Sequence, residues 1–174
     1  MKKLIAFFVI ALVAVSCNNQ KAEPAKETAA TVALPYTVAY SSSFEMGNPK
    51  YSASILQGSW KDWETNKMDN MKGWIADTIV AFHSDNSMIT GADSLIARWK
   101  RGRAAYTSVV DSIDAVIPVY STDKKENWVL VWAREINTKA DGTKDTMALM
   151  ETWRINKDGK ADMLLQYDRA KRKK

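Results

Sequence analysis

Cysteine and histidine are almost absent from this chain, which has one of each among 174 residues. The single thiol, Cys17, cannot close a disulfide within the chain. The single histidine, His83, cannot build a zinc site of the usual cysteine and histidine ligands, so we predict no metal. The sequence also has no glycine-rich phosphate loop and no serine nucleophile elbow. We therefore expect neither nucleotide chemistry nor a bound cofactor.

Apolar runs of membrane-spanning length are missing as well. The longest run, from Leu4 to Val15, follows two lysines and has the length of a signal-peptide core. It ends in Ala14-Val15-Ser16-Cys17, which resembles a bacterial lipobox. We interpret residues 1–16 as a lipoprotein signal peptide and Cys17 as the lipidation site. Acyl chains such as palmitate would anchor the protein in the bacterial cell envelope, on the periplasmic side of the outer membrane. A plain secretory signal and a short membrane anchor are the alternatives.

Large apolar side chains are also scarce in residues 17–35, which are rich in Ala, Thr, Lys and Glu. Such a segment cannot bury enough surface to offset the entropy of ordering it, so we predict a flexible tether after the lipidated cysteine. Residues 36–168 then suit one domain with a single core. Whether the stretch just before Asn48 adds an extended segment to the domain is ambiguous.

Positive charge is concentrated at the end of the chain. The formal net charge is +5, and residues 169–174 alone carry five basic side chains. A nucleic-acid interface needs basic residues spread over a face or groove, so we predict no nucleic-acid partner. We interpret residues 169–174 as a solvated basic tail, with attraction to anionic lipid headgroups as the alternative.

Hydrophobic periodicity predicts helices in the first half of the domain and strands in the second. Residues 48–66 form a helix with Pro49 in its first turn. We then expect a short helical turn over 68–74, strands over 75–83 and 88–89, and a helix over 90–101 that ends at Gly102. The later strands are one bent strand over 104–110 and 113–120, then 128–137, 147–155 and 161–168. Gly142 and Gly159 mark two hairpin turns, so the predicted class is α+β.

Three stretches resemble the SnoaL-like branch of the nuclear transport factor 2-like superfamily. They are Ala76-Asp77 in a strand, Gly91 with Asp93 at a helix start, and the hairpin from Trp153 to Lys160. The resemblance covers residues 48–168 and implies a cone-shaped fold, with N-terminal helices packed on a curved antiparallel sheet around a pocket. Ketosteroid isomerases, polyketide cyclases, dehydratases and non-catalytic binding proteins share this fold, so it does not decide the activity.

The resemblance also suggests two catalytic candidates. Counted from Ala76-Asp77, His83 falls where ketosteroid isomerases carry their general-base aspartate. Counted back from the turn at Gly159, Glu151 falls where they carry the acid of the oxyanion hole. Their tyrosine falls at Ser59 or Trp60, and since neither is a tyrosine, steroid isomerisation itself is not expected.

The chemistry of the two residue types agrees with such a pair. Imidazole groups exchange protons near neutral pH, and burial in an apolar pocket can keep a carboxyl group neutral. Strand alternation places Glu151 on one face with apolar side chains, those of Met147, Leu149, Trp153 and Ile155. For His83, a solvated residue at a strand end is the alternative.

Seven tryptophans are many for a domain of this size, and aromatic side chains often line ligand pockets. Our ligand-binding candidates are Trp60, Trp63, Trp128, Trp132, Trp153 and Tyr167, with Arg134 at the polar end of the ligand. Core packing is the alternative for each aromatic residue.

Three functions remain open, and whether the protein is an enzyme is undecided. The first is an envelope lipoprotein that binds a small apolar or amphipathic molecule. The second is a cofactor-free isomerase, cyclase or dehydratase that uses His83 and Glu151. The third is a non-catalytic interaction protein that forms a homodimer through an outer sheet face made of Val129, Val131, Ala133, Ala148 and Met150.

Overall fold

The computed structural model describes residues 34–170. The chain divides into two compact units, residues 1–37 and residues 38–174. Of the first unit only residues 34–37 are described, and these form no helix or strand. The expected signal peptide, Cys17 and most of the tether lie outside the described residues, as do residues 171–174. No helix in the described range is both long enough and apolar enough to cross a membrane.

The second unit is built on a seven-stranded sheet, with strand order β1-β4-β5-β6-β7-β2-β3. The strands are β1 (Phe44–Met46), β2 (Ile75–Phe82), β3 (Met88–Thr90), β4 (Ser108–Ser121), β5 (Glu126–Thr138), β6 (Lys144–Ile155) and β7 (Ala161–Ala170). Strands β4 to β7 form the expected antiparallel meander. Its turns place Gly142 and Gly159 at φ of 81° and 76°, which only glycine adopts without strain.

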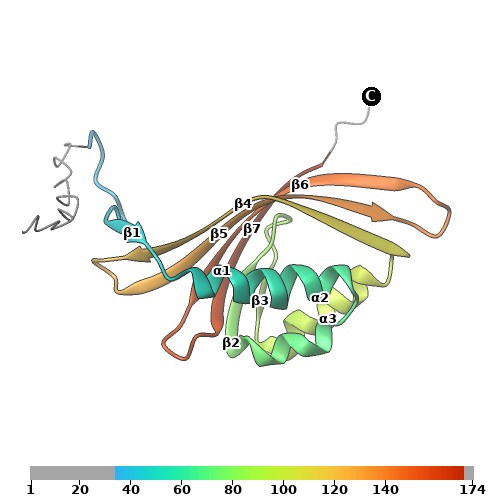
Figure 1. Cartoon of the computed structure of the whole chain (residues 1–174), viewed down its shortest axis with the longest axis horizontal. Coiled ribbons are helices and arrows are strands. Elements are labelled where there is room, and N and C mark those ends of the chain that lie inside the picture. The colour runs from blue at the N-terminus through green and yellow to red at the C-terminus, as the bar shows by residue number, and fades with distance from the viewer. Residues whose placement is uncertain (1–33, 171–174) are drawn as a thin grey trace, which may run out of the picture. The chain divides into compact units, whose positions relative to one another are not determined.

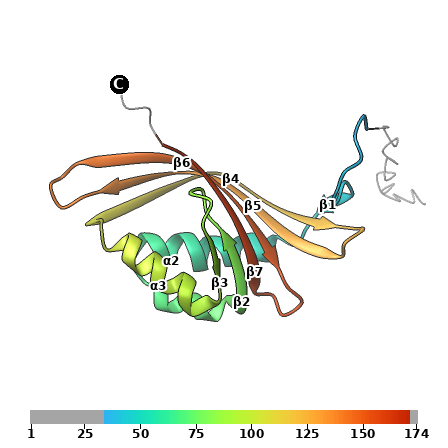
Figure 2. The same ribbon diagram turned by 180° about the vertical axis from the view of Figure 1, so that it is seen from behind.

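The sheet is mixed, which corrects the expectation of a purely antiparallel one. Strand β2 joins the far edge of the meander and runs parallel to β7. The α+β class is confirmed, with the helices on one face of the sheet and the sheet curving around them (Figures 1 and 2). We call the face under the helices the inner face and the opposite one the outer face.

The predicted helix over 48–66 is one helical segment with three parts. These are α1 (Pro49–Ile55), a π-helical turn η1 (Leu56–Trp60) and α2 (Lys61–Glu64). The Asn48 side chain accepts a hydrogen bond from the Lys50 backbone N–H and caps the start, and Pro49 occupies the first turn as predicted. The 3₁₀ turn η2 (Met68–Gly73) then leads into β2.

Helix α3 (Ala92–Arg103) continues past Gly102, which corrects the predicted end. The physical reason is the side chain of Arg103, which is 6% exposed. Its guanidinium donates to the backbone carbonyls of Trp63, Glu64 and Tyr106 over 2.9, 3.2 and 2.8 Å. These three hydrogen bonds fix the last turn of α3 against α2, so tertiary contacts override the helix-ending tendency of glycine.

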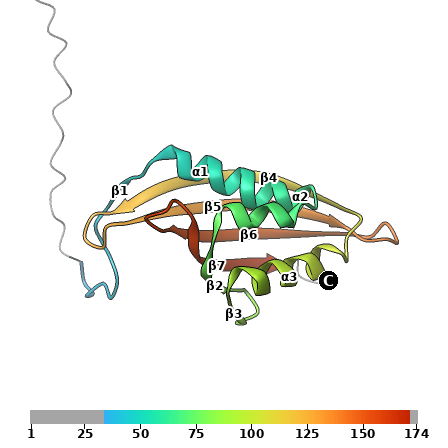
Figure 3. The same ribbon diagram turned by 90° about the horizontal axis from the view of Figure 1, so that it is seen from below.

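The core lies between the helices and the inner face (Figure 3). Val129, Val131 and Ala133 belong to it and are at most 2% exposed, so they cannot form an outer dimer face as expected. Side chains alternate along a strand, and the outer face of β5 therefore carries the even-numbered residues. The prediction for β6 is correct in its alternation, because Leu149, Glu151 and Trp153 are all buried on the inner side.

Candidate functional site

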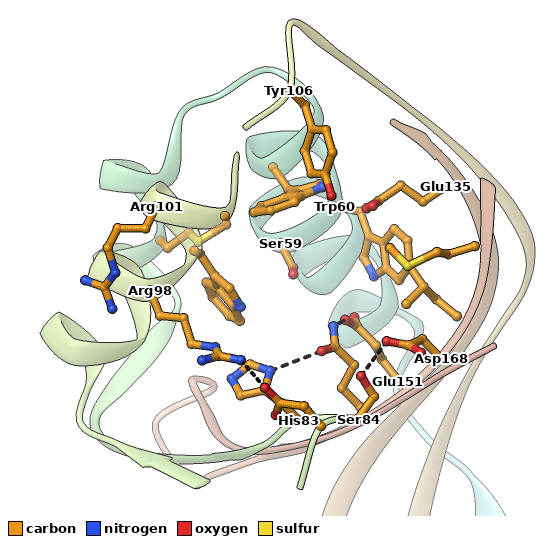
Figure 4. A pocket seen from close by; sticks show the side chains of 18 residues that line it. Ser59, Trp60, His83, Ser84, Arg98, Arg101, Tyr106, Glu135, Glu151 and Asp168 are labelled. Atoms are coloured by element: carbon orange, nitrogen blue, oxygen red, sulfur yellow. Dashed lines mark hydrogen bonds and ion pairs between the residues drawn. The ribbon is translucent and has the colours of Figure 1, made fainter. Parts of the chain in front are cut away.

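A cavity of about 520 Å³ lies between the helices and the inner face of the sheet. The helical segment η1–α2 supplies one wall, α3 a second, and strands β5, β6 and β7 with the turn after β2 the third. In Figure 4, Tyr106 and Glu135 lie at one end of the cavity, and His83 and Ser84 lie at the opposite end. Glu151 lies between these two ends.

The π-helical turn brings Ser59 and Trp60 into the wall together. Both are buried, at 8% and 5% exposure, and both line the cavity. The turn also packs closely on the residue that precedes β2, because a Cβ added to Gly58 would come within 2.4 Å of the Trp74 indole nitrogen. Glycine at this position therefore lets the helix approach the sheet, and single π-helical turns of this kind are frequent at functional sites.

His83 follows directly after β2 and points into the cavity. Its backbone N–H donates to the Ser87 carbonyl over 2.9 Å, which closes the turn to β3. The imidazole is 8% exposed, and its Nδ1 lies 3.0 Å from the Gln166 side-chain oxygen. Its other ring nitrogen, Nε2, is buried and has no hydrogen-bond partner among the described residues.

Glu151 lies in the middle of β6 and is 6% exposed. Its carboxyl oxygens accept hydrogen bonds from the Gln166 side-chain amide over 2.9 Å and from the Trp153 indole over 3.0 Å. Burial raises the pKa of Glu151 to about 7, although these two hydrogen bonds oppose the shift. The Trp60 indole N–H approaches the carboxyl group and also lowers its pKa, without a hydrogen bond of normal geometry.

Gln166 connects the two catalytic candidates. Its amide N–H₂ donates to Glu151, so its carbonyl oxygen is left to face His83. That oxygen can only accept, and the neutral imidazole must therefore carry its proton on Nδ1. Nε2 then carries the lone pair, the group that a general base uses, and it has no hydrogen-bond partner among the described residues. Sequence reasoning missed Gln166, although it is the direct β7 partner of Glu151.

The sequence matches no family model and no curated protein sequence. Solved structures are similar in fold. A protein of unknown function from Exiguobacterium sp. 255-15 superposes with a TM-score of 0.56 at 16% identity, over 66% of this chain and 98% of its own. A Mycobacterium tuberculosis protein in complex with estradiol-17beta-hemisuccinate superposes with a TM-score of 0.54 at 16% identity, over 67% and 92% of the two chains.

A third similar structure has a ketosteroid isomerase-like fold, comes from Catenulispora acidiphila and is in complex with trimethylamine. Its TM-score is 0.54 at 12% identity, over 69% of this chain and 85% of its own. This is the nuclear transport factor 2-like fold. At these identities the likeness establishes the architecture alone, and what the cavity does has to be argued from its own side chains.

Within the nuclear transport factor 2-like fold, four of the candidate residues line the cavity: His83, Glu151, Trp60 and Trp63. Trp153 lies behind them in the core. It is fully buried, does not line the cavity, and packs edge-on against Trp74 and Trp99. Its contribution to the site is the hydrogen bond to Glu151.

Four other candidates do not reach the cavity, which corrects the expectation. Trp132 and Arg134 lie on the outer face of β5, where Arg134 pairs with Asp114 over 2.8 Å. Trp128 packs edge-on against Tyr40, and Tyr167 is 60% exposed on the outer side of β7. The alternation along β5 and β7 accounts for all four, because their odd-numbered neighbours on β5 and Gln166 on β7 face inward.

Trp99, Tyr106 and Glu135 also line the cavity and were not among the ligand-binding candidates. Glu135 was the hardest to find, because it is a carboxyl group in the inner face of a strand otherwise read as apolar. It is 5% exposed, and burial raises its pKa. At the rim near His83, Arg98 pairs with Asp85 over 2.8 Å and the Ser84 hydroxyl donates to Asp168.

Proposed function

We propose that this protein binds a small apolar or amphipathic molecule in its cavity, with the polar end of the ligand at His83. The observation that carries the proposal is a cavity of about 520 Å³ whose lining includes His83, an imidazole with one buried nitrogen that has no partner in the described part of the chain. Small-molecule sites are concave, mostly apolar, and carry a few convergent polar groups. Here Trp60, Trp99 and Leu149 supply apolar wall.

Two of the similar structures support a small-molecule partner in a general way. One was solved with estradiol-17beta-hemisuccinate and another with trimethylamine. These ligands belong to those proteins, and their difference in size and charge shows that the fold does not choose the ligand. The choice for this chain therefore depends on its own lining.

Binding of the neutral dye Nile red tests the proposal. Ser59→Phe would place a ring in the cavity, because Ser59 is buried in its wall. We expect this variant to bind the dye at least tenfold more weakly than the wild type. Ser112→Phe, on the exposed part of β4, is the matched control and should bind normally. Equal binding by both variants would show that the dye, and the proposed ligand, do not use the cavity.

A second candidate function is proton transfer on the bound molecule. It is favoured by one arrangement: a base lone pair on His83 Nε2 and, on the same wall, a carboxyl group whose pKa is raised to about 7. Deuterium exchange at the α-carbon of cyclohex-3-en-1-one in D₂O, followed by NMR, would report such a base. We expect His83→Gln to abolish the exchange while Nile red binding persists. An exchange rate equal to that of buffer alone would refute the proposed proton transfer.

Anchoring in the cell envelope is part of the proposal, on the sequence features of residues 1–17. We expect the protein to fractionate with membranes in its bacterial host and Cys17→Ser to move it to the soluble fraction. Recovery of the wild-type protein in the soluble fraction would contradict the proposed lipid anchor.

Homodimerisation remains a proposal that keeps Met150 from the face first expected and replaces the buried Val129, Val131 and Ala133. Trp132, Met150 and Tyr167 are neighbours in register across the outer face of β5, β6 and β7. None of the described helices covers this face (Figures 1 and 3). Light scattering after size-exclusion chromatography should show a dimer that Trp132→Glu converts to a monomer. A wild type that is monomeric at high concentration would exclude it.

A further inference from the structure

The cavity is lined by more acidic than basic side chains. Its charged lining residues are four carboxyl groups and two guanidinium groups: Asp85, Glu135, Glu151, Asp168, Arg98 and Arg101. Arg98 is already paired with Asp85. Both arginines come from α3 and lie at one side of the cavity in Figure 4, apart from Glu135. The end of the cavity at Glu135 therefore has no basic residue in its lining.

Hydrogen-bond acceptors gather behind this end. Glu135 and Asp111 are direct cross-strand partners on β5 and β4. The Asn137 side-chain N–H₂ donates to Glu135, which leaves the Asn137 oxygen buried and without a partner in the described residues. Both carboxyl oxygens of Asp111 are also buried and have no hydrogen-bond partner in the described residues. Burial and the nearby Glu135 raise the pKa of Asp111 to about 8.

The protein's own cations do not balance this group. Arg103 lies near enough to lower the pKa of Glu135, yet three of its N–H groups are used by backbone carbonyls. The Lys61 ammonium lowers the pKa of Asp111, but by less than burial and the nearby carboxyl groups raise it. Lys61 also pairs with Glu64. Buried carboxyl groups without a counter-charge are costly, so they hold a proton until a cation takes its place.

Aromatic side chains surround the same end of the cavity. Trp60, Trp63 and Tyr106 line it together with Glu135. The Trp63 indole approaches the Glu135 carboxyl group closely enough to lower its pKa. A carboxylate among aromatic rings is the combination that recognises alkylated ammonium groups, because the rings attract the cation without competing for it as water does. No group of three His, Cys, Asp or Glu side chains in the described range could hold a metal ion, so an organic cation fits better.

We propose that the cavity takes a ligand with an alkylammonium group, seated at Glu135 among Trp60, Trp63 and Tyr106. This inference rests on the proposed function and adds the charge of the ligand to it. The apolar body of the ligand would extend along the cavity toward His83. The unpartnered Nε2 of His83 would then accept a hydrogen bond from the ligand's other end.

Choline and its neutral carbon isostere, 3,3-dimethylbutan-1-ol, test the charge directly, because they share one shape. Isothermal titration of the purified protein should show choline binding at least tenfold more tightly than the alcohol. Glu135→Gln should remove that preference by weakening choline and leaving the alcohol unchanged. Asp158→Asn, which removes one exposed carboxyl group in the β6–β7 turn, is the charge-matched control and should retain the preference.

The outcomes separate this inference from the proposed function. Choline that binds no better than its isostere, or not at all, overturns the inference, while Nile red binding would still support a neutral ligand. Loss of Nile red binding as well would overturn both. If Glu135→Gln does not fold, as judged by circular dichroism, the comparison of the two compounds on the wild type still decides. A preference that survives in a folded Glu135→Gln also overturns the assignment to Glu135.

Discussion

Replacing Glu151 by glutamine should make the protein more stable at pH 8 and less stable at pH 4.5. The substitution keeps the shape of the side chain and removes its charge. In the wild type the carboxyl group is buried, and its pKa is raised to about 7. The folded state therefore binds a proton between pH 4.5 and 7 that the unfolded state has already released.

The magnitude follows from the difference between the two pKa values. Raising the pKa from the ordinary 4.5 to about 7 corresponds to about 3 kcal/mol of stability, present below pH 4.5 and lost as the pH rises through 7. Glutamine has no such dependence. It has only one acceptor oxygen for the two donors, Trp153 and Gln166, so it loses a hydrogen bond worth about 1 kcal/mol at every pH. The variant should thus be about 1 kcal/mol less stable in acid and about 2 kcal/mol more stable at pH 8.

Urea unfolding at several pH values between 4.5 and 8 measures this difference. Subtracting the variant from the wild type cancels the other titrating groups, including Asp111, whose pKa is also raised, and Asp123, whose pKa is lowered to about 2. Glu45→Gln, on the exposed strand β1, is the matched control and should show no such reversal. A difference between wild type and Glu151→Gln that is constant across this range would refute the reasoning.

Three further predictions test the architecture of the site. Gly58→Ala should lower the free energy of unfolding by about 2 kcal/mol, because its Cβ would overlap the facing indole, whereas Gly73→Ala, with open space around it, should have little effect in the same urea assay. The neutral imidazole of His83 should show a protonated Nδ1 in ¹⁵N-correlated NMR spectra, and the opposite tautomer would contradict the assigned hydrogen bond to Gln166. Arg103→Gln should cost about 3 kcal/mol in thermal or urea unfolding by orphaning buried carbonyls, and a loss below about 1 kcal/mol would mean that water replaces the guanidinium.

Much of the fold could be predicted because its signals are local. Alternation along β6 placed Glu151 among buried apolar side chains, and the turn glycines at 142 and 159 placed the two hairpins. The direction of β2 could not be predicted in this way. Its pairing with β7 depends on contacts between segments far apart in the chain, which leave no trace in local periodicity.

The prediction assigned the inner and outer faces of β5 the wrong way round, for a different reason. Its largest apolar side chain in the middle of the strand, Trp132, faces outward, while Glu135 and Asn137 face inward and are buried. Hydrophobicity alone assigns such a strand the wrong way round. The inner face is polar here because it borders a cavity, so a buried carboxyl group on a strand is itself the signal of a site. The same argument identifies Gln166, whose partner across the strands is Glu151.

The amide of Gln166 limits what kind of catalyst this site can be. A side-chain amide donates and accepts hydrogen bonds, but it does not release its protons near neutral pH, so it cannot pass a proton from His83 to Glu151. It can transmit charge: when Nε2 takes a proton from a ligand, the imidazolium strengthens its bond to the amide oxygen, and the amide N–H₂ in turn favours an ionised Glu151. Protonation of one residue thereby eases ionisation of the other. Such coupling would serve the second candidate function, in which one proton is removed and another delivered at two points of the same ligand.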